Sequence, residues 1–293
     1  MGHGSVKVQG KKFKVQDFYS SQIGTQLSLT IEDVKIKDIS EIKGLEGLTE
    51  ITSLGLSNNE ITEIKGLDSL TNLQQLFLNN NQLTSISGLD KLTKLDRIFL
   101  NGNQITEIGG LDALSNLQWL ELKENKITEI KGLEKVTSLI QLELEKNQII
   151  EIKGLDTLVN LQVLGLARNQ ITEIKNLEKL LNLTRIKLDH NQIEEIKGLD
   201  KLINLDSVDL SSNKIAEIKG LETLTKLENL SLDTNQIKEL KGLDTLEKLS
   251  FMTLGFNPFP EEAKQFAQMT VMGEDNIKAL LKSYNEWKQG RSG

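Results

Sequence analysis

The chain has 293 residues, no cysteine and a formal net charge of −7 at pH 7. The lack of cysteine disfavours a disulfide-stabilised secreted repeat protein and favours a reducing compartment, so we expect a cytoplasmic, intracellular protein. The negative charge gives no general attraction to nucleic acid or anionic membrane. No apolar run approaches the roughly 18 residues of a membrane-spanning helix. We therefore expect neither nucleic acid nor membrane as a partner.

The N-terminal residues predict a hairpin. Residues 1–5, Met-Gly-His-Gly-Ser, resemble a cloning remnant, because they lack the apolar segment of a signal peptide. The stretch from Val6 to Val15 alternates apolar and polar residues on both sides of Gly10. Two short alternating runs that flank a glycine are typical of a β-hairpin.

The next residues are predicted to form a capping half-repeat, so that residues 6–40 as a whole begin the array. Val34 precedes Leu56 by 22 residues, and Ile39 precedes Ile61 by the same interval. We therefore place this segment in phase with the repeats that follow it. Its polar substitutions suit a terminal repeat, whose outer side meets water.

A 22-residue period runs through residues 41–257 without an insertion. Its marker is an asparagine that recurs at Asn59, Asn81, Asn103, Asn125, Asn147, Asn169, Asn191, Asn213, Asn235 and Asn257. Within each repeat, a stretch such as Leu76-Phe77-Leu78 alternates with period two, which predicts a short strand with inward leucines. Stacked repeats are needed to bury these leucines in one core. The asparagines are predicted to be structural, since a buried amide can bond backbone groups of adjacent coils.

The repeat resembles a known family. From Leu70 to Ile86 it reads Leu-x-x-Leu-x-x-Leu-x-Leu-x-x-Asn-x-Leu-x-x-Ile, the pattern of leucine-rich repeats. The period is similar to that of the subclass found in the protein phosphatase one regulatory subunit and in bacterial internalins. The resemblance implies an α/β solenoid: a right-handed horseshoe with a parallel sheet on its concave side, 3₁₀ or short turns on its convex side, and a cap at each end. It also implies protein binding through the concave face.

The register stops after Asn257, and residues 258–293 are predicted to be a helical C-terminal cap. Residues 261–269 and 274–288 predict two helices. Their expected buried residues are Ala263, Phe266 and Ala267 in the first, and Ile277, Leu280, Leu281, Tyr284 and Trp287 in the second. These helices are expected to cover Phe251 and Phe256. A connector to a further domain is the alternative, and residues 291–293 resemble a second cloning remnant.

The sequence lacks the common motifs of catalytic, cofactor and metal sites. It has no cysteine nucleophile, no Gly-rich phosphate loop and no metal-type histidine spacing. His190 is expected to be a surface residue. The abundant carboxylates form columns, as at Glu151 and Glu173, each followed two residues later by lysine, as at Lys153 and Lys175. Such columns predict a solvated face, so we expect no enzyme activity, no cofactor and no metal.

The outward strand positions vary between repeats, whereas the flanks repeat almost verbatim. Phe77 and Phe99 are predicted to be direct neighbours on adjacent strands, with Trp119 diagonal to Phe99 and Arg97 beside them. Aromatic residues and arginine are typical interface anchors, although cross-strand packing is an alternative role for them. The predicted protein-binding set is Phe77, Arg97, Phe99, Trp119, Glu121, Glu143, Arg185 and Lys187.

These patterns predict a monomeric, non-enzymatic scaffold that binds a partner protein on its concave face. The charged columns support the location, because they are interrupted at Ser85, Ser87 and Gly109, in the repeats that carry the phenylalanines. Two alternatives stay open. The chain can be the regulatory subunit of a phosphatase or other enzyme, or it can be an engineered or consensus-derived repeat scaffold, as its near-identical flanks suggest.

Overall fold

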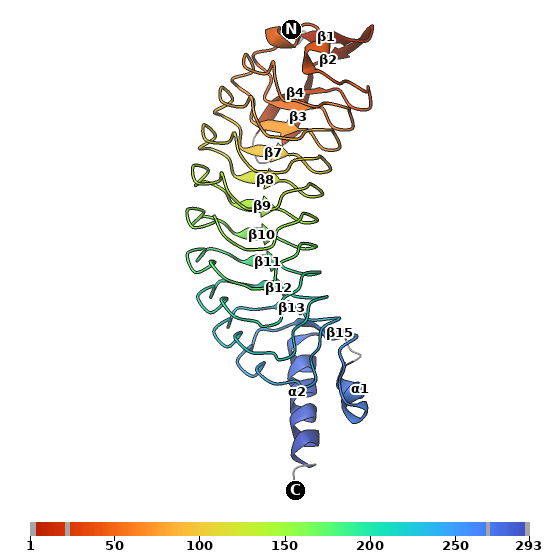
Figure 1. Ribbon diagram of the computed structural model, residues 1–293, viewed down its shortest axis with the longest axis vertical. Coiled ribbons are helices and arrows are strands. Elements are labelled where there is room, and N and C mark those ends of the chain that lie inside the picture. The colour runs from red at the N-terminus through yellow and green to blue at the C-terminus, as the bar shows by residue number, and fades with distance from the viewer. Residues whose placement is uncertain (1–3, 21–23, 268–269, 291–293) are drawn as a thin grey trace. The chain divides into compact units, whose positions relative to one another are not determined.

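The computed structural model describes residues 4–20, 24–267 and 270–290, which belong to two compact units, residues 1–148 and 149–293. In each unit the chain winds in coils, and each coil contributes one short strand beside the strand of the next coil (Figure 1). The residues predicted as cloning remnants lie partly outside the described part of the chain, as does Met269 at the end of the first predicted C-terminal helix.

The described residues of the first unit form nine strands and two 3₁₀ helices. They are β1 (Ser5–Val8), β2 (Lys11–Lys14), β3 (Gln16–Ser20), β4 (Gly24–Thr30), η1 (Ile39–Glu41), η2 (Leu45–Gly47), β5 (Ser53–Gly55), β6 (Gln75–Phe77), β7 (Arg97–Phe99), β8 (Trp119–Glu121) and β9 (Gln141–Glu143). Strands β1 and β2 pair as an antiparallel hairpin. The main sheet has the order β9-β8-β7-β6-β5-β4-β3, in which only β3 and β4 pair antiparallel.

The second unit repeats this arrangement and ends in helices. Its elements are β10 (Val163–Gly165), β11 (Arg185–Lys187), β12 (Ser207–Asp209), β13 (Asn229–Ser231), β14 (Phe251–Thr253), η3 (Glu261–Ala263), α1 (Lys264–Ala267), β15 (Thr270–Met272) and α2 (Glu274–Gln289). Strands β10 to β14 are parallel neighbours in chain order, and β15 pairs antiparallel with β14.

The apolar alternation explains this winding. Leu76 and Leu78 are fully buried, while Phe77 between them is half-exposed on the outer side of the sheet, which we call the strand face. The return segment closes through turns, in which Leu70 donates to the Leu67 carbonyl at 2.9 Å and Leu73 donates to the Leu70 carbonyl at 2.9 Å. The predicted leucine-rich repeat solenoid with short turns opposite its sheet is therefore confirmed.

The marker asparagines connect successive coils. In the first unit, the Asn81 side-chain amide donates to the carbonyl of Leu78 in its own coil at 3.1 Å and to Leu56 of the preceding coil at 3.0 Å. Its oxygen accepts the Ile61 amide at 3.0 Å. Asn81 is buried, and so are its bonds to the Leu56 carbonyl and the Ile61 amide. The predicted structural role is confirmed, because these bonds satisfy backbone groups that no strand pairing reaches.

The predicted register of the first coil is wrong by three residues. Strand β4 pairs with β5 so that Leu29 lies opposite Leu54, an offset of 25 residues instead of 22. Ile36, and not Ile39, therefore occupies the place of Ile61, and its amide donates to the Asn59 side chain at 3.2 Å. The extra residues lie in the return segment, where an Asp38 capping box starts η1. A longer return segment leaves the strand register intact, and the 22-residue spacing alone could not reveal it.

The C-terminal segment contains a strand that the sequence did not predict. Residues 261–269 were predicted as one helix, but the described part ends with α1 at Ala267 and continues with β15. Val271 is 7% exposed and lies opposite the buried Met252 of β14. Helix α2 agrees with the predicted second helix and buries Ile277 and Tyr284. The role of this segment as a cap stays a prediction.

The expectation that the helices cover Phe256 is wrong. Phe256 is 90% exposed and has a positive φ of 57°. It occupies the left-handed position that Arg168, His190 and Thr234 take in earlier coils, where every side chain points to solvent. Position in the repeat therefore decides the exposure of this ring. Phe251, by contrast, is half-buried and pairs with Met272 of β15.

Neighbouring return segments approach each other closely at Gly132. Gly132 has a φ of 72°, and a Cβ atom there would meet the Ile108 carbonyl oxygen at 2.4 Å. Gly66 has a similar φ of 80° but open space around it. We expect Gly66→Ala to destabilise the protein by about 1 kcal/mol through backbone strain alone. Gly132→Ala adds overpacking and is expected to cost about 2 kcal/mol more. Thermal melts of both variants check this, and equal losses would contradict it.

Candidate protein-binding surfaces

Aromatic rings gather on the strand face of the first unit. Strands β6 and β7 pair with Phe77 opposite Phe99, and the two rings stack with centroids 4.6 Å apart and planes within 1°. Both residues are half-buried, because each covers one face of the other. The sequence predicted this contact. Parallel pairing at the 22-residue register places like positions of consecutive repeats side by side.

Trp119 and Arg97 extend the aromatic rings by one strand. They lie opposite each other on β7 and β8, and the Arg97 guanidinium carbon is 5.5 Å from the Trp119 ring centroid. This is a cation–π distance. The Arg97 Nε atom is also 3.9 Å from an Asp96 carboxylate oxygen. Burial raises the pKa of Asp96, and the Arg97 charge partly offsets this effect. We call Phe77, Phe99, Trp119 and Arg97 the aromatic surface.

Glu121 fixes the indole ring from the other side. Trp119 Nε1 donates to one Glu121 carboxylate oxygen at 3.0 Å, and Asn101 Nδ2 donates to the other at 2.6 Å. Asn101 is itself held by two hydrogen bonds. Its backbone amide donates to the Asn79 side-chain oxygen, and its own side-chain oxygen accepts the Lys123 backbone amide, both at 2.8 Å. The orientation of Trp119 is therefore set before any partner arrives.

A lysine lies among carboxylates next to this surface. Lys123 Nζ is 2.8 Å from Glu145 and 3.4 Å from Glu143. Burial is the largest influence on the pKa of Lys123 and would lower it. The hydrogen bond to Glu145 and the charges of Glu143, Glu145 and Glu121 outweigh that influence, so the pKa of the ammonium group is raised. Glu143 is only 2% exposed and accepts a bond from Gln141 at 2.7 Å. It lies below the surface, where it positions its neighbours.

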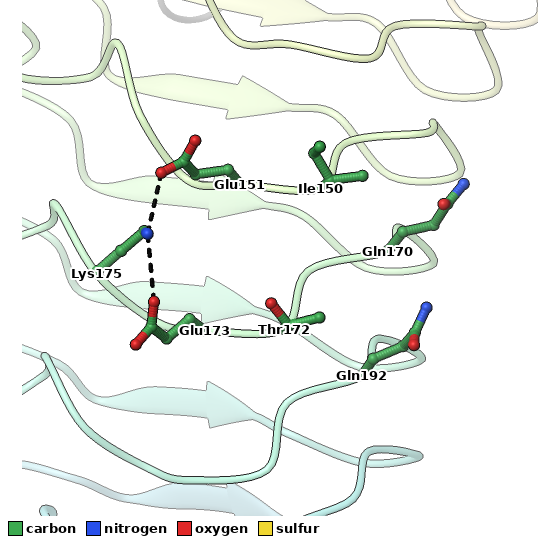
Figure 2. A pocket seen from close by; sticks show the side chains of 7 residues that line it. All are labelled: Ile150, Glu151, Gln170, Thr172, Glu173, Lys175 and Gln192. Carbon is green, nitrogen blue, oxygen red and sulfur yellow. Dashed lines mark ion pairs between the residues drawn. The ribbon is translucent and has the colours of Figure 1, made fainter.

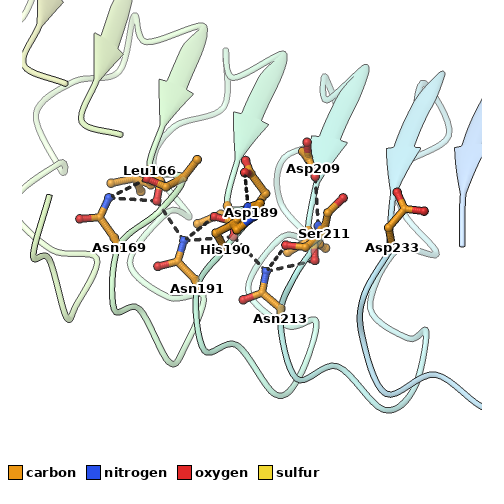
Figure 3. Close-up of polar contacts among 12 residues, drawn as sticks. Leu166, Asn169, Asp189, His190, Asn191, Asp209, Ser211, Asn213 and Asp233 are labelled. Atoms are coloured by element: carbon orange, nitrogen blue, oxygen red, sulfur yellow. Dashed lines mark hydrogen bonds and ion pairs between the residues drawn. The ribbon is translucent and has the colours of Figure 1, made fainter. Parts of the chain in front are cut away.

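The strand face of the second unit carries basic and acidic residues instead. Arg185 is exposed and Lys187 half-buried on β11, and Lys187 lies opposite Asp209 of β12. His190 follows β11, with its Nδ1 atom 2.9 Å from Asp189 (Figure 3). It is a surface side chain, as expected.

The carboxylates of this face influence one another. The pKa of Asp209 is raised, mainly because the carboxyl group is buried. Hydrogen bonds from the Ser211 backbone and hydroxyl lower this pKa, whereas the charges of Asp189 and Asp233 raise it. The Ser211 amide donates to Asp209 at 3.0 Å (Figure 3). Asp233 is held separately by the Thr253 hydroxyl and by the Gly255 amide at 2.7 Å. Each carboxylate thus has protein donors of its own.

The charged flank of the second unit contains a shallow cavity of about 420 Å³. Lys175 on its wall bridges Glu151 at 3.0 Å and Glu173 at 3.2 Å (Figure 2). Hydrogen bonds to these two carboxylates raise the pKa of Lys175. Ile150, 62% exposed, stands at the cavity where the next repeat has Thr172. The charged side chains of this flank form ion pairs with one another across repeats, which agrees with the predicted solvated face.

The structure adds residues to the predicted set and separates others. It brings together Phe77, Arg97, Phe99, Trp119 and Glu121 in the first unit, with the buried Glu143 opposite Glu121 on the next strand. Arg185 and Lys187 belong to the second unit. Sequence reasoning missed the supporting roles of Asn101 and Lys123. Both directly follow the second inward leucine of their strands, so the period-two alternation predicts that they point outward.

The described residues include no group of three or more histidine, cysteine or acidic side chains placed to hold a metal ion. None of their helices is both long enough and apolar enough to cross a membrane.

Stacked 22-residue coils, inward leucines, buried asparagines and short return turns define a leucine-rich repeat protein. Residues 49–91, 71–113, 159–201 and 203–245 match the family described as Leucine Rich repeats (2 copies). The chain belongs to this family. No match is found among curated protein sequences.

Solved structures of bacterial internalins are similar to the chain. An internalin, InlF, of Listeria monocytogenes has 29% identity and a TM-score of 0.71, over 79% of this chain and 68% of that one. Internalin C2 of the same organism has 33% identity and a TM-score of 0.59, over 64% of this chain and 81% of that one. The functional domain of InlJ has 25% identity and a TM-score of 0.58, and the chain covers 53% of it. This likeness supports an interaction scaffold.

Proposed function

We propose that the protein is a non-enzymatic scaffold that binds a partner protein on the strand face of its first unit, the face that the family resemblance makes concave. The aromatic surface anchors the partner. The observation that carries this proposal is a set of large rings that are oriented by protein contacts and still partly open to solvent.

The geometry suits an interface anchor in three respects. The side chains are fixed beforehand, so binding loses little side-chain entropy. Trp, Phe and Arg are the residue types that dominate binding energies when a partner buries them. The adjacent Glu121, Glu145 and Lys123 give the rim of the surface a defined charge pattern, which would select the orientation of a partner. Glu143 positions Lys123 from below.

The basic pair Arg185 and Lys187 is proposed as a separate contact of the second unit. Surface charges of this kind mainly raise the rate of association, and their effect weakens with added salt. Regulation of a phosphatase or other enzyme would be one use of such a scaffold. Recovery of a catalytic subunit as the bound partner would identify that use.

The test compares the parent protein with a Phe99→Ala, Trp119→Ala double variant. Both are used to capture partners from a lysate of the source organism, and captured proteins are quantified by mass spectrometry. Each anchor is expected to contribute about 2 kcal/mol or more, so the double variant should bind its partner at least about 700-fold more weakly in calorimetry.

Leu181→Ala is the matched control, because Leu181 is 53% exposed but lies in a return segment of the second unit. It should bind like the parent. Loss of the Phe77–Phe99 stack lowers stability by about 0.2–1 kcal/mol, so melting curves must show that the double variant is folded at the assay temperature. If the double variant binds its partner within twofold of the parent, the rings serve sheet packing only.

A further inference from the structure

The last strand of the second unit has an open edge. Phe251 of β14 donates its amide to Glu228, and the Thr253 carbonyl accepts from Leu232, so these groups face β13. The N–H and C=O groups of Met252 therefore face β15, where Val271 lies opposite. Gly273 continues the alternation by donating to Ser250 at 2.7 Å. It follows that Thr270 and Met272 direct their backbone groups away from β14, toward the outer edge.

A groove runs beside this edge. It has a volume of about 610 Å³ and is lined by β15, by Phe266 of α1, and by Ala279, Leu280 and Ser283 of α2. Figure 1 shows α1 and α2 as two separate segments next to β15. The ring of Phe266 packs edge-on against the ring of Tyr284, with the ring centroids 5.3 Å apart. This contact holds α1 against α2. The groove is thus lined by two helices that contact each other.

Two apolar side chains that line the groove are open to solvent. Met272 is 63% exposed, and Leu280 is half-exposed although it lies on the predicted apolar side of α2. Asn276 donates to the Met272 carbonyl at 2.7 Å. Among the described residues, the Thr270 N–H and C=O and the Met272 N–H are then the edge groups open to pairing. Exposed strand edges of this kind readily accept another strand.

We propose that this groove is a binding site for an extended peptide segment of a partner protein, which adds to β15 as a further strand. Only an extended backbone presents N–H and C=O groups at the spacing that the edge demands. A side chain of the incoming segment that stands beside Val271 shares its face and enters the groove against Phe266 and Leu280.

The charges near the groove define the peptide further. Glu274 and Asp275 lie in the first turn of α2, directly after β15. They favour a lysine or arginine at the end of the segment that lies next to Met272. The site therefore selects an alternating apolar segment with a basic residue at one end.

The experiment uses a phage-displayed library of random twelve-residue peptides, selected on the full chain. Selected peptides should alternate apolar and polar residues, and the synthetic peptides should protect the Thr270 and Met272 amides from hydrogen exchange. Leu280→Arg fills the groove and should weaken binding at least tenfold. Leu181→Arg places the same change on another exposed leucine and should have no effect.

A second pair of variants tests the backbone pairing. Thr270→Pro removes an outward N–H group without removing a bond to β14, and it should weaken binding at least tenfold. Thr270→Ala keeps that group and should bind within twofold of the parent. The Phe99→Ala, Trp119→Ala variant should also bind normally, which separates this site from the aromatic surface.

Three results would overturn the proposal. The first is a selection without enrichment over the Leu280→Arg variant. The second is enriched peptides that bind the Leu280→Arg or Thr270→Pro variant as well as the parent. The third is dimerisation of the chain in sedimentation that Leu280→Arg abolishes, because the occupant would then be a second copy. Circular dichroism melts confirm that each variant is folded before binding is measured.

Discussion

Inserting one residue between Leu120 and Glu121 is expected to destabilise the first unit by at least about 4 kcal/mol. Leu120 of β8 and Leu122, which directly follows this strand, are both fully buried. Because strand side chains alternate, the insertion turns one of these leucines to the solvent face and brings a polar residue inward. Loss of one buried leucine alone costs about 2–5 kcal/mol. The melting temperature should fall by more than about 10 °C.

An insertion between Glu134 and Lys135 of the same coil is the control. Both residues are exposed in the return segment. The first coil already accommodates three extra residues in its own return segment without losing the pairing of β4 with β5. The control should therefore melt close to the parent. If both insertions lower the melting temperature equally, the strand assignment of Leu120 to Leu122 is wrong.

Asn103→Ala is expected to destabilise the first unit by about 3 kcal/mol or more. The Asn103 amide donates to the carbonyls of Leu78 and Leu100, each at 3.0 Å, and its oxygen accepts the Leu83 amide at 3.1 Å. Alanine leaves the buried Leu83 amide without its acceptor, which costs about 1–3 kcal/mol. The Leu78 and Leu100 carbonyls keep their bonds from Asn81 and Asn125 but lose the bonds from Asn103, each worth about 0.5–1.5 kcal/mol. The melting temperature should fall by about 6–12 °C.

Two comparisons sharpen this prediction. Gln104→Ala changes the neighbouring exposed side chain, which only accepts a bond from Lys126, and should have little effect. Asn103→Asp keeps an acceptor for Leu83 but loses the donor and places a charge near two carbonyl oxygens, so it should be at least as harmful as alanine. An Asn103→Ala protein that melts within 2 °C of the parent would contradict the structural role, since this is about the shift expected for less than 1 kcal/mol.

The sequence was sufficient for the features that depend on the period alone. Parallel pairing of repeats follows from the inward leucines, and it places Phe77 beside Phe99 and Arg97 beside Trp119. The bonding of Asn81 also follows, because a buried amide in each coil must serve backbone groups. These predictions rest on interactions that recur identically in every coil.

The features that were missed depend on places where the repeat ends. The Thr270–Met272 segment has no alternation of its own, and it becomes a strand because β14 offers it an edge to pair with. The first coil slips by three residues because its return segment is longer. The charges around Trp119 were predicted as contacts, but the arrangement that buries Glu143 and leaves Glu121 half-buried depends on side-chain bonds that the period does not encode.

The asparagine bonds have a consequence for how such a chain changes length over evolution. Each links a coil to the one before it through donors and acceptors that are the same at every step, as Asn81 and Asn103 do. Recombination that removes or duplicates 22 residues therefore rejoins equivalent groups and leaves no coil without its bonds. Within the first unit, each such event would shift the aromatic surface relative to the N-terminal hairpin by about 4.8 Å, the spacing of neighbouring strands. Unequal crossing-over can thus adjust the reach of the binding surface in fixed steps while the coil itself stays unchanged.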